Sequence, residues 1–422
     1  EQVVFPGEET SIWTQDKATG EWYLHMFAKH QPDLNVANDK VRDEIAKSMG
    51  FWLQLGLDGF RLDAVPFFLE LQGTSKEGSA QVDPHDYLSA LRSFLNRRNG
   101  SGVLLGEVNV PYKDQVKYFG GAAGNELNMQ FDFLSMQNLY LSLAREDARP
   151  LAKSLSSRPK IHPDNQWAMF VRNHDELTLD KLSDAEREEV FAAFGPDEDM
   201  QMYGRGLRRR LPTMLNGDPA RIRMVYSLMF ALPGTPVLFY GEEIGMGEDL
   251  TAKGRSAVRS PMQWNDAENG GFSTAPAKDL VAQVVDGYFA PKNVNAAAAK
   301  RDPDSLWNFM ATLIQRYRES PELGWGDFEL IKHPAEKVLL HRCTWGGSTV
   351  VLAHNFGAEP ASVAANLSSA GDPEPDFEGA YLRDLLDGED VELAHDGGFE
   401  LELDRYGYRW FRIQRPGERY IP

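Results

Sequence analysis

The sequence predicts an α/β fold built from parallel strands and crossover helices, followed by a smaller all-β module. Helical and strand patterns alternate up to about residue 320, which favours βα units. From about residue 321 onwards, short alternating runs are separated by Gly, Asp and Pro, as in antiparallel sheets. Apolar residues make up 42% of the 422 positions and aromatic residues 11%, which is enough for a large buried core.

The α/β region opens with a helix and a strand. Asn38 is a good N-cap, and apolar residues follow it at the spacing of one helix face as far as Leu55. Gly56 ends this helix, and residues 59–65 read Gly-Phe-Arg-Leu-Asp-Ala-Val, a short strand. The same arrangement recurs along the chain. The further predicted elements are helices at 86–97, 135–145 and 218–232, and strands at 103–108, 128–133, 167–175 and 235–241.

Two segments interrupt this alternation. Residues 180–211 form a polar insertion rich in Asp, Glu and Arg, and residues 246–300 lack periodicity and predict an excursion loop. The pair Asp302-Pro303 then opens a strongly amphipathic helix. The all-β module that follows has strand patterns at 328–332, 338–344, 348–355, 361–366, 379–386 and 398–413.

The charge balance excludes several kinds of partner. The chain has 44 Lys and Arg against 63 Asp and Glu, a formal charge of −19. Because phosphate binding relies on patches of Lys and Arg, we expect no nucleic acid partner and favour a neutral ligand. No apolar run is long enough to span a bilayer, so we expect no membrane partner and a cytoplasmic location. Cys343 is the single cysteine, and its apolar neighbours favour a buried residue over a catalytic thiol.

Acidic residues stand at three predicted strand ends, Asp63, Glu107 and Asp175. The carboxyl ends of strands form the reactive face of parallel α/β barrels, and a carboxylate buried there without a function is costly. Two of the three could be the paired carboxylates of glycoside cleavage, one ionised and one protonated. Arg61 shares a strand face with Asp63 and can hold it ionised, so Asp63 is the better nucleophile and Glu107 the better acid. A core ion pair between Arg61 and Asp63 is an equally good reading of this local pattern.

His174 and Asp175 are adjacent, a pairing that has several interpretations. The chain has no H-x-x-H, H-E-x-x-H or Cys/His clustering, which disfavours a catalytic metal. It also has no G-x-S-x-G elbow, which disfavours a Ser-His-Asp triad. The remaining interpretation is that His174 and Asp175 form hydrogen bonds with a neutral ligand.

Four blocks of sequence together resemble the α-amylase superfamily of retaining α-glucoside hydrolases and transglycosylases. They begin at Gly59 (Gly-Phe-Arg-Leu-Asp-Ala-Val), Gly106 (Gly-Glu-Val-Asn), Val171 (Val-Arg-Asn-His-Asp-Glu) and Gly234 (Gly-Thr-Pro-Val-Leu-Phe-Tyr-Gly-Glu-Glu-Ile-Gly-Met). Within that family the chain is most similar to the trehalose synthases, which interconvert maltose and trehalose. The supporting stretches are 30–35, 172–179, 208–211, 241–249 and 259–264.

The resemblance implies a (β/α)8 barrel, of which strands four to eight fall in this sequence, and a C-terminal β-sandwich. It implies that Asp63 is the nucleophile, Glu107 the general acid/base, and Asp175 the carboxylate that grips sugar hydroxyls. Arg61 and His174 would line the same sugar subsite, and Ala64 would go with a preference for α-1,4 bonds. The chemistry would need no cofactor, a structural calcium ion is allowed, and the metal ligands are unknown.

Two departures from the family pattern stand out. The acid/base block continues with Val108 and Asn109, where trehalose synthases usually have Gln-Trp. The first three barrel strands, with the block that supplies a calcium ligand, have no counterpart before residue 51. Because a parallel sheet does not tolerate open edges, we expect a portion of a longer chain, with closure by another copy as the alternative. The expected divisions are a remnant of an inserted domain and loop at 1–37, the catalytic barrel at 38–320 with lids at 180–211 and 246–300, and the sandwich at 321–422.

Three hypotheses for function follow. The first is a glucosyl-transferring isomerase acting on maltose and trehalose, which needs a closed pocket that excludes water. The second is an α-glucosidase or α-amylase that hydrolyses α-1,4-glucosides, including short malto-oligosaccharides. The third is a carbohydrate-binding relative without activity, and the intact Asp63, Glu107 and Asp175 disfavour it. A homo-oligomer is compatible with each of them.

Two further features call for structural interpretation. The Arg205–Arg210 cluster favours a solvated or interface surface over an anion site. Trp325, Trp345 and Trp410 of the β module favour core packing over carbohydrate binding.

Overall fold

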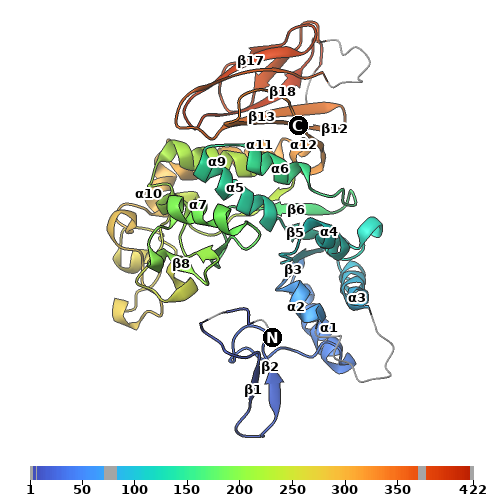
Figure 1. Cartoon of the computed structure of the whole chain (residues 1–422), viewed down its shortest axis with the longest axis vertical. Helices are drawn as coiled ribbons and strands as arrows, with labels where there is room; N and C mark the ends of the chain where they lie inside the picture. Colours follow the sequence, from blue (N-terminus) through green and yellow to red (C-terminus); the bar gives the residue numbers. More distant parts are fainter. Residues whose placement is uncertain (1–2, 6, 71–82, 369–376, 419–422) are drawn as a thin grey trace. The chain divides into compact units, whose positions relative to one another are not determined.

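The computed structural model describes residues 3–5, 7–70, 83–368 and 377–418 of the chain (Figure 1). The chain divides into two compact units. Unit 1 comprises residues 1–132 and 158–168, and unit 2 comprises residues 133–157 and 169–422.

Unit 1 begins with an antiparallel hairpin of β1 (Trp13–Gln15) and β2 (Trp22–Leu24). Helix α1 (Asp39–Gln54) follows, and the Asn38 side chain accepts a hydrogen bond from the backbone N–H of Lys40. Ser, Thr, Asp and Asn are favoured at this position because they satisfy a free N–H of the first turn. The predicted helix and its N-cap are thus confirmed.

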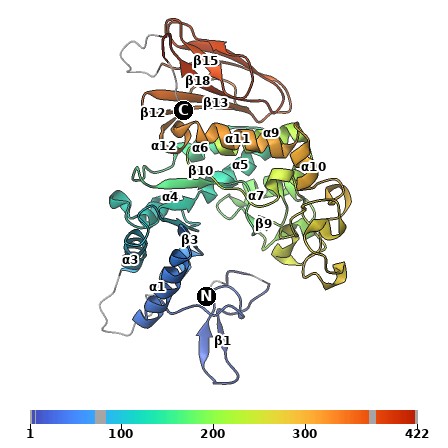
Figure 2. The ribbon, with the colours of Figure 1, turned by 180° about the vertical axis from the view of Figure 1, so that it is seen from behind.

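A parallel sheet forms the centre of unit 1. Strands β3 (Gly59–Leu62), β4 (Val103–Gly106), β5 (Met129–Phe131) and β6 (Gln166–Met169) pair in that order. Helices α2 (Val65–Glu70), α3 (Pro84–Asn96) and α4 (Tyr112–Gln115) connect them, with short 3-10 turns η2 (Val116–Phe119) and η3 (Gly121–Ala123). Figure 2 shows α1 and α3 near β3.

The core of unit 1 lies between this sheet and its helices. Met49 of α1, Leu88, Leu91 and Leu95 of α3, and Leu104 of β4 belong to one buried cluster. These positions recur at three or four residues in the helices, so a single helix face supplies them. The periodicity read from the sequence therefore identified the core side of α3. For α1 it holds in part, because Met49 is buried but Trp52, on the same predicted face, is 47% exposed.

The part of unit 2 that precedes the β-sandwich consists mainly of helices and contains the short strand β10 (Thr235–Pro236). The backbone N–H of Val237, just after β10 (Thr235–Pro236), donates to the carbonyl of Met169 at the end of β6 (2.7 Å). The α-helices are α5 (Phe133–Arg145), α6 (Arg149–Ser156), α7 (Asp184–Phe194), α8 (Leu211–Met214), α9 (Pro219–Ala231), α10 (Ala296–Arg301), α11 (Leu306–Arg318) and α12 (Pro321–Trp325).

The two predicted insertions differ in character. Segment 180–211 contains α7 with a full capping box at Ser183, and a small sheet of β7 (Leu177–Thr178), β9 (Gly206–Leu207) and β8 (Gln201–Met202) lies beside it. Segment 246–300 is mostly irregular up to α10, as the lack of periodicity predicts. Its short turns are η6 (Gly254–Val258), η7 (Glu268–Gly271), η8 (Ala277–Asp279) and η9 (Gly287–Phe289); the turns η4 (Glu198–Met200) and η5 (Glu242–Ile244) lie before it.

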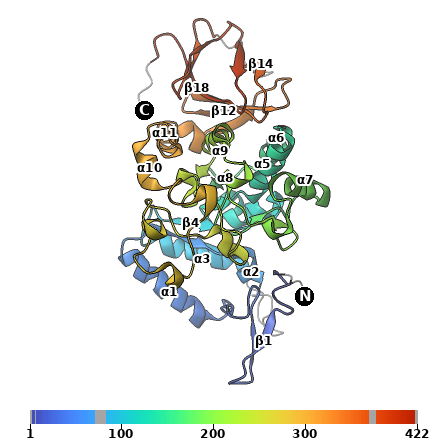
Figure 3. The same ribbon diagram turned by 90° about the vertical axis from the view of Figure 1, so that its left-hand side faces the viewer.

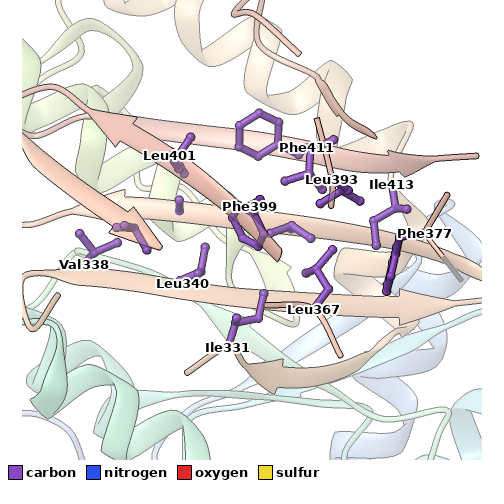
Figure 4. Close-up of a cluster of buried hydrophobic side chains, with 14 of the residues drawn as sticks. Ile331, Val338, Leu340, Leu367, Phe377, Leu393, Phe399, Leu401, Phe411 and Ile413 are labelled. Carbon is purple, nitrogen blue, oxygen red and sulfur yellow. The ribbon is translucent and has the colours of Figure 1, made fainter. Parts of the chain in front are cut away.

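A β-sandwich ends unit 2. One antiparallel sheet has the order β11-β12-β13-β18-β15-β16, and β14 pairs with β17 in a second. Side chains of both sheets, among them Leu340, Phe399 and Phe411, form one buried cluster (Figure 4). The strands are β11 (Asp327–Leu330), β12 (Val338–Trp345), β13 (Ser348–Asn355), β14 (Ala361–Asn366), β15 (Tyr381–Asp384), β16 (Val391–Glu392), β17 (Gly398–Leu403) and β18 (Tyr408–Gln414).

Helix α9 packs against the larger sheet of the sandwich (Figure 3). The hydroxyl of Ser227 on α9 lies 2.9 Å from the indole N–H of Trp410 and 3.0 Å from Nε2 of His354. All three side chains are buried, so this small polar network joins helix and sheet inside unit 2. Within the described residues, no helix is long and apolar enough to cross a membrane.

Candidate active site

Two of the predicted acids lie together in unit 1. Nη1 of Arg61 lies 2.8 Å from Oδ1 of Asp63, and Nη2 of the same guanidinium contacts Oε2 of Glu107. Arg61 belongs to β3 and Asp63 directly follows it, and Glu107 directly follows the neighbouring strand β4, which pairs with β3 in parallel. One arginine therefore holds both carboxylates at the carboxyl ends of β3 and β4.

The backbone fixes the separation of these strand ends. The N–H of Glu107 donates to the carbonyl of Leu62 (3.0 Å), and the N–H of Val65 donates to the carbonyl of Glu107 (3.1 Å). Ala64, between Asp63 and Val65, has φ +46°, a left-handed conformation that costs a non-glycine residue about 1 kcal/mol or more. The chain thus accepts local strain directly after Asp63 and turns sharply there.

The two carboxylates differ in exposure. The Asp63 side chain is 73% exposed and that of Glu107 21%. The sequence favoured burial for both, and for Asp63 this is wrong: the residue lies just beyond the end of β3, directly before the left-handed residue Ala64. A core ion pair between Arg61 and Asp63 is therefore excluded. The arrangement instead presents one accessible carboxylate beside a more enclosed one.

The segment that follows Glu107 is anchored on β5. The hydroxyl of Tyr112 donates to Oδ1 of Asp132 (2.7 Å), and the Arg158 guanidinium lies 2.6 Å from Oδ2 of the same carboxylate. Nε2 of Gln115 donates to the carbonyl of Phe131 (3.1 Å). Asp132 is fully buried, and its charge is compensated by these contacts, as a buried charge requires.

The third acid, Asp175, belongs to unit 2 and is held by arginines. Its Oδ1 lies 2.6 Å from Nη2 of Arg259, 3.1 Å from Nη1 of Arg255 and 3.7 Å from Nε2 of His174. The Asp175 side chain is only 16% exposed, while that of His174 is 45% exposed. The side chains of His174 and Asp175 are thus adjacent in space as well as in sequence, and the Asp175 carboxylate is paired with two guanidinium groups.

The same arginines organise the neighbouring backbone. Nε of Arg255 lies 2.5 Å from Oε2 of Glu176, and Nε of Arg259 donates to the carbonyl of His174 (2.6 Å). Arg172 is buried and donates to the carbonyl of Asp175 (2.7 Å). Both faces of the turn at residues 174–176 are therefore fixed by hydrogen bonds to guanidinium groups.

Arg255 and Arg259 were not assigned a role from the sequence. They lie in segment 246–300, which has no periodicity to suggest a neighbour, and Arg259 is 84 positions from Asp175. The one available signal was their spacing of four in Gly254-Arg-Ser-Ala-Val-Arg259, in a segment otherwise poor in arginine. The structure adds both to the candidate site.

The expectation for the arginine cluster at 205–210 is wrong for three of its members. Arg210 is 2% exposed, and its guanidinium donates to the carbonyls of Val258 and Tyr240. Arg208 donates to the carbonyls of Ala252 and Leu250, and Arg209 pairs with Glu248. These side chains hold segment 246–258 in place, because its irregular backbone has carbonyls with no partner in a helix or sheet.

Unit 2 also contains a buried glutamate, Glu242. The backbone N–H of Phe239 donates to Oε2 of Glu242 (2.7 Å), and the Tyr226 hydroxyl lies 3.3 Å from Oε1. Burial raises the pKa of Glu242 to about 7, against the opposing effects of the Phe239 N–H and of Arg210 and Arg172. Burial likewise lowers the pKa of Arg172 and Arg210.

No metal centre is found among the residues that the structure describes, since no three or more His, Cys, Asp or Glu side chains there gather as ligands. The calcium ligands allowed by the resemblance are therefore not found in these parts of the chain. The carboxylates described above are engaged by arginine instead.

Comparison with known families gives two matches. The model of the α-amylase catalytic domain matches residues 4–191 and 207–326. That of the sucrose hydrolase-like C-terminal domain matches residues 347–412, within the β-sandwich.

Similar proteins are found among characterised enzymes. A trehalose synthase of Pimelobacter sp. (strain R48) is 35% identical over 427 residues, covering 98% of this chain and 73% of that protein. A trehalose synthase/amylase of Mycobacterium tuberculosis is 34% identical over 420 residues, with coverages of 98% and 68%. An oligo-1,6-glucosidase of Halalkalibacterium halodurans is 27% identical over 400 residues, with coverages of 82% and 65%.

Solved structures share the fold. An α-amylase from H. orenii superposes with a TM-score of 0.70 at 19% identity, covering 96% of this chain and 72% of that one. A trehalulose synthase from Pseudomonas mesoacidophila gives 0.65 at 22% identity, with coverages of 96% and 74%. These likenesses confirm the predicted (β/α)8 barrel fold, of which β3, β4, β5, β6 and β10 are strands, together with the C-terminal β-sandwich. The chain belongs to the α-amylase family.

Proposed function

We propose that the protein is a retaining α-glucoside-active enzyme that interconverts maltose and trehalose by intramolecular glucosyl transfer. The observation that carries this proposal is the pairing of Asp63 and Glu107 through Arg61 at neighbouring strand ends. Relatives named trehalose synthase, 35% and 34% identical, support the choice of substrate. The catalytic part would extend over residues 38–320 and the sandwich over 321–422.

In the first step the Asp63 carboxylate attacks the anomeric carbon of the non-reducing glucose of maltose. The bond from that carbon to the bridging oxygen breaks, and Glu107 gives its proton to this oxygen, so that free glucose forms. The product at Asp63 is a β-glucosyl ester. The 73% exposure of Asp63 leaves the nucleophile accessible. Glu107 is proposed for the acid role, for which it must give up its contact with Arg61 and take up a proton.

In the second step the released glucose turns before it can leave the protein and presents its anomeric hydroxyl. Glu107 removes the proton of that hydroxyl, whose oxygen attacks the glucosyl carbon, and the Asp63 carboxylate leaves. Two inversions at one carbon give net retention and an α,α-linked product, trehalose. Water in place of glucose would give hydrolysis by the same two steps.

Asp175 is proposed to hold sugar hydroxyls, with His174 beside it. In the sugar-free protein the Asp175 carboxylate is paired with Arg255 and Arg259. A sugar hydroxyl that binds Asp175 must therefore either share the carboxylate with these arginines or displace one of them. Both arginines come from segment 246–300, which therefore is coupled to substrate binding. This coupling supports a covering role for the segment, and exclusion of water favours transfer over hydrolysis.

Hydrolysis of α-1,4-glucosides is the second candidate function. The name of the 34% identical Mycobacterium tuberculosis relative includes amylase, and the 27% identical relative is named a glucosidase. A role in carbohydrate binding without catalysis is the weakest candidate, because Asp63, Glu107 and Asp175 are all present.

Incubation of the whole chain with maltose, followed by separation of the sugars, tests the proposal. Trehalose is the expected main product, with minor glucose. Glucose without trehalose would contradict transfer while leaving glycosidase chemistry intact. Absence of any conversion would contradict both and favour the binding role.

A further inference from the structure

Two tryptophans of unit 2 stand outside both the catalytic region and the core. Trp325 ends α12 and Trp345 ends β12, and their side chains are 51% and 50% exposed. Their ring centroids lie 6.4 Å apart with an interplanar angle of 36°. The expectation of core packing holds for Trp410, which is fully buried, and is wrong for this pair. The reason is position, since both rings lie at the end of their element.

The two elements that carry the pair, α12 and β12, are packed closely together. Glu322 on α12 is fully buried and accepts hydrogen bonds from Nε of Arg412 (3.1 Å) and from the Ser348 hydroxyl (2.5 Å). A side chain at Gly326 would meet the backbone nitrogen and oxygen of Thr344 at 3.0 Å, so α12 approaches β12 closely. The backbone that carries the two indoles is therefore in place before a ligand binds, which lowers the entropic cost of binding.

The turn next to Trp345 carries no side chains. The turn after Trp345 consists of Gly346 and Gly347, with φ of +58° and +84°, and a Cβ at either position would meet no atom within 4 Å. A Gly-Gly turn suits the twist of a hairpin. It also leaves this edge of the indole surface free of side chains that could cover it.

The size and charge of the surface fit a small neutral ligand. Arg412 balances the charge of Glu322, which precedes Trp325 in α12. Two half-exposed indoles offer roughly 150–250 Å² together, whereas a stable protein interface needs about 800 Å² on each partner. Among the described residues beyond Ile314, these two are the only large apolar side chains that are exposed. A second copy of the chain is thus a poor occupant.

We propose that Trp325 and Trp345 form a secondary binding site for an α-1,4-glucan chain. The C–H faces of a sugar ring are apolar and its hydroxyls lie at the edge, so pyranose rings stack on indole faces and keep their hydroxyls in water. Two adjacent sugar rings can stack on two adjacent indoles, whose centroids lie 6.4 Å apart. The proposal shares the sugar class of the proposed function but needs no turnover.

The test uses the Asp63→Asn chain, which is not expected to consume the ligand. Its mobility in a native gel containing glycogen, and its titration with maltoheptaose by calorimetry, report glucan binding. Trp325→Ala and Trp345→Ala in this background are each expected to weaken glucan affinity at least about tenfold, and the double change to abolish retardation. Trp22→Ala, which removes a 63% exposed tryptophan of the β1–β2 hairpin, is the matched control and should bind as the parent does.

Two further measurements keep the outcomes distinct. Trp325→Tyr retains an aromatic face and should keep most of the binding, which separates stacking from loss of packing. Unretarded parent protein, or a double variant that binds glycogen like the parent, would overturn the proposal whatever the result with maltose. It would also fail if sedimentation showed a dimer that the double change dissociates while glucan binding stays intact.

Discussion

The acidic residues of the two units are positioned in different ways. In unit 1 one arginine, Arg61, joins Asp63 of its own strand to Glu107 of the next. In unit 2 two arginines from a distant irregular segment, Arg255 and Arg259, surround Asp175. Regular secondary structure supplies the first arrangement, and it follows from strand alternation and parallel register. The second requires that segment 246–300 fold back onto the turn at 174–176.

The difference extends to burial. Asp63 is 73% exposed, whereas Asp175 is 16% exposed and adjoins buried ionisable groups, Arg172 and Glu176. Substitutions of Arg61 and Asp63 in unit 1 should therefore lower the rate of the reaction with little effect on the stability of the fold. Substitutions around Asp175 in unit 2 should act on substrate binding, water exclusion and stability together.

The largest effect is expected for Asp63→Asn. Loss of the nucleophile should lower turnover of maltose by at least about a thousandfold. Because the side chain is mostly exposed, the midpoint of thermal unfolding should stay within a few degrees of the parent. Asp43→Asn, at an exposed position of α1, is the control for removal of a negative charge. Near-parental turnover by the Asp63 variant would refute the nucleophile assignment.

Arg61→Met is expected to have the next largest effect. Loss of the shared guanidinium should lower kcat/KM for maltose by about a hundredfold, because two charge-assisted contacts disappear. Arg61→Lys should be intermediate, since one ammonium cannot reproduce a planar fork. Steady-state kinetics of both, with Arg97→Met at an exposed site as control, would measure this. Equal activity of the Lys and parent proteins would show that the bridging geometry is unimportant.

Arg255→Gln tests the arrangement in unit 2. Loss of its contacts with Asp175 and Glu176 should lower kcat/KM by about tenfold and raise the share of glucose among the products. Arg318→Gln, an exposed change at the end of α11, should alter neither quantity. Product ratios at equal conversion are the measurement. A lowered kcat/KM without more glucose would separate positioning of Asp175 from exclusion of water.

The smallest effect concerns pH and Glu242. Burial raises its pKa from 4.5 to about 7, so between these values the folded protein keeps a proton that the unfolded chain has lost. That proton stabilises the folded state, and the contribution disappears as the pH rises through 7. Glu242→Gln should remove about 1 kcal/mol of the stability difference between pH 6 and pH 8. Denaturant unfolding at both values tests this, with the neighbouring Glu243→Gln as control; an unchanged pH dependence would contradict it.

Local patterns predicted much of unit 1 correctly. The N-cap at Asn38, the core face of α3, and the juxtaposition of Arg61 with Asp63 depend on residues a few positions apart. The same reasoning failed for exposure. Asp63 was expected to be buried, but it lies beyond the end of β3, beside the left-handed residue Ala64, and its side chain is 73% exposed.

The sequence by itself determined the order of the βα units, the sandwich, and the strand ends after which Asp63 and Glu107 stand. The strand predicted at 167–175 ends at Met169 instead, so Asp175 lies beyond it. Periodicity and turn chemistry are properties of adjacent residues, so they can be read without coordinates. Only the tertiary structure decided that Arg255 and Arg259 reach Asp175, that Arg210 is buried, and that Trp325 and Trp345 stay exposed. Each of these depends on which distant segment folds against the residue, and the free energy of burial is set by that neighbour rather than by the residue itself.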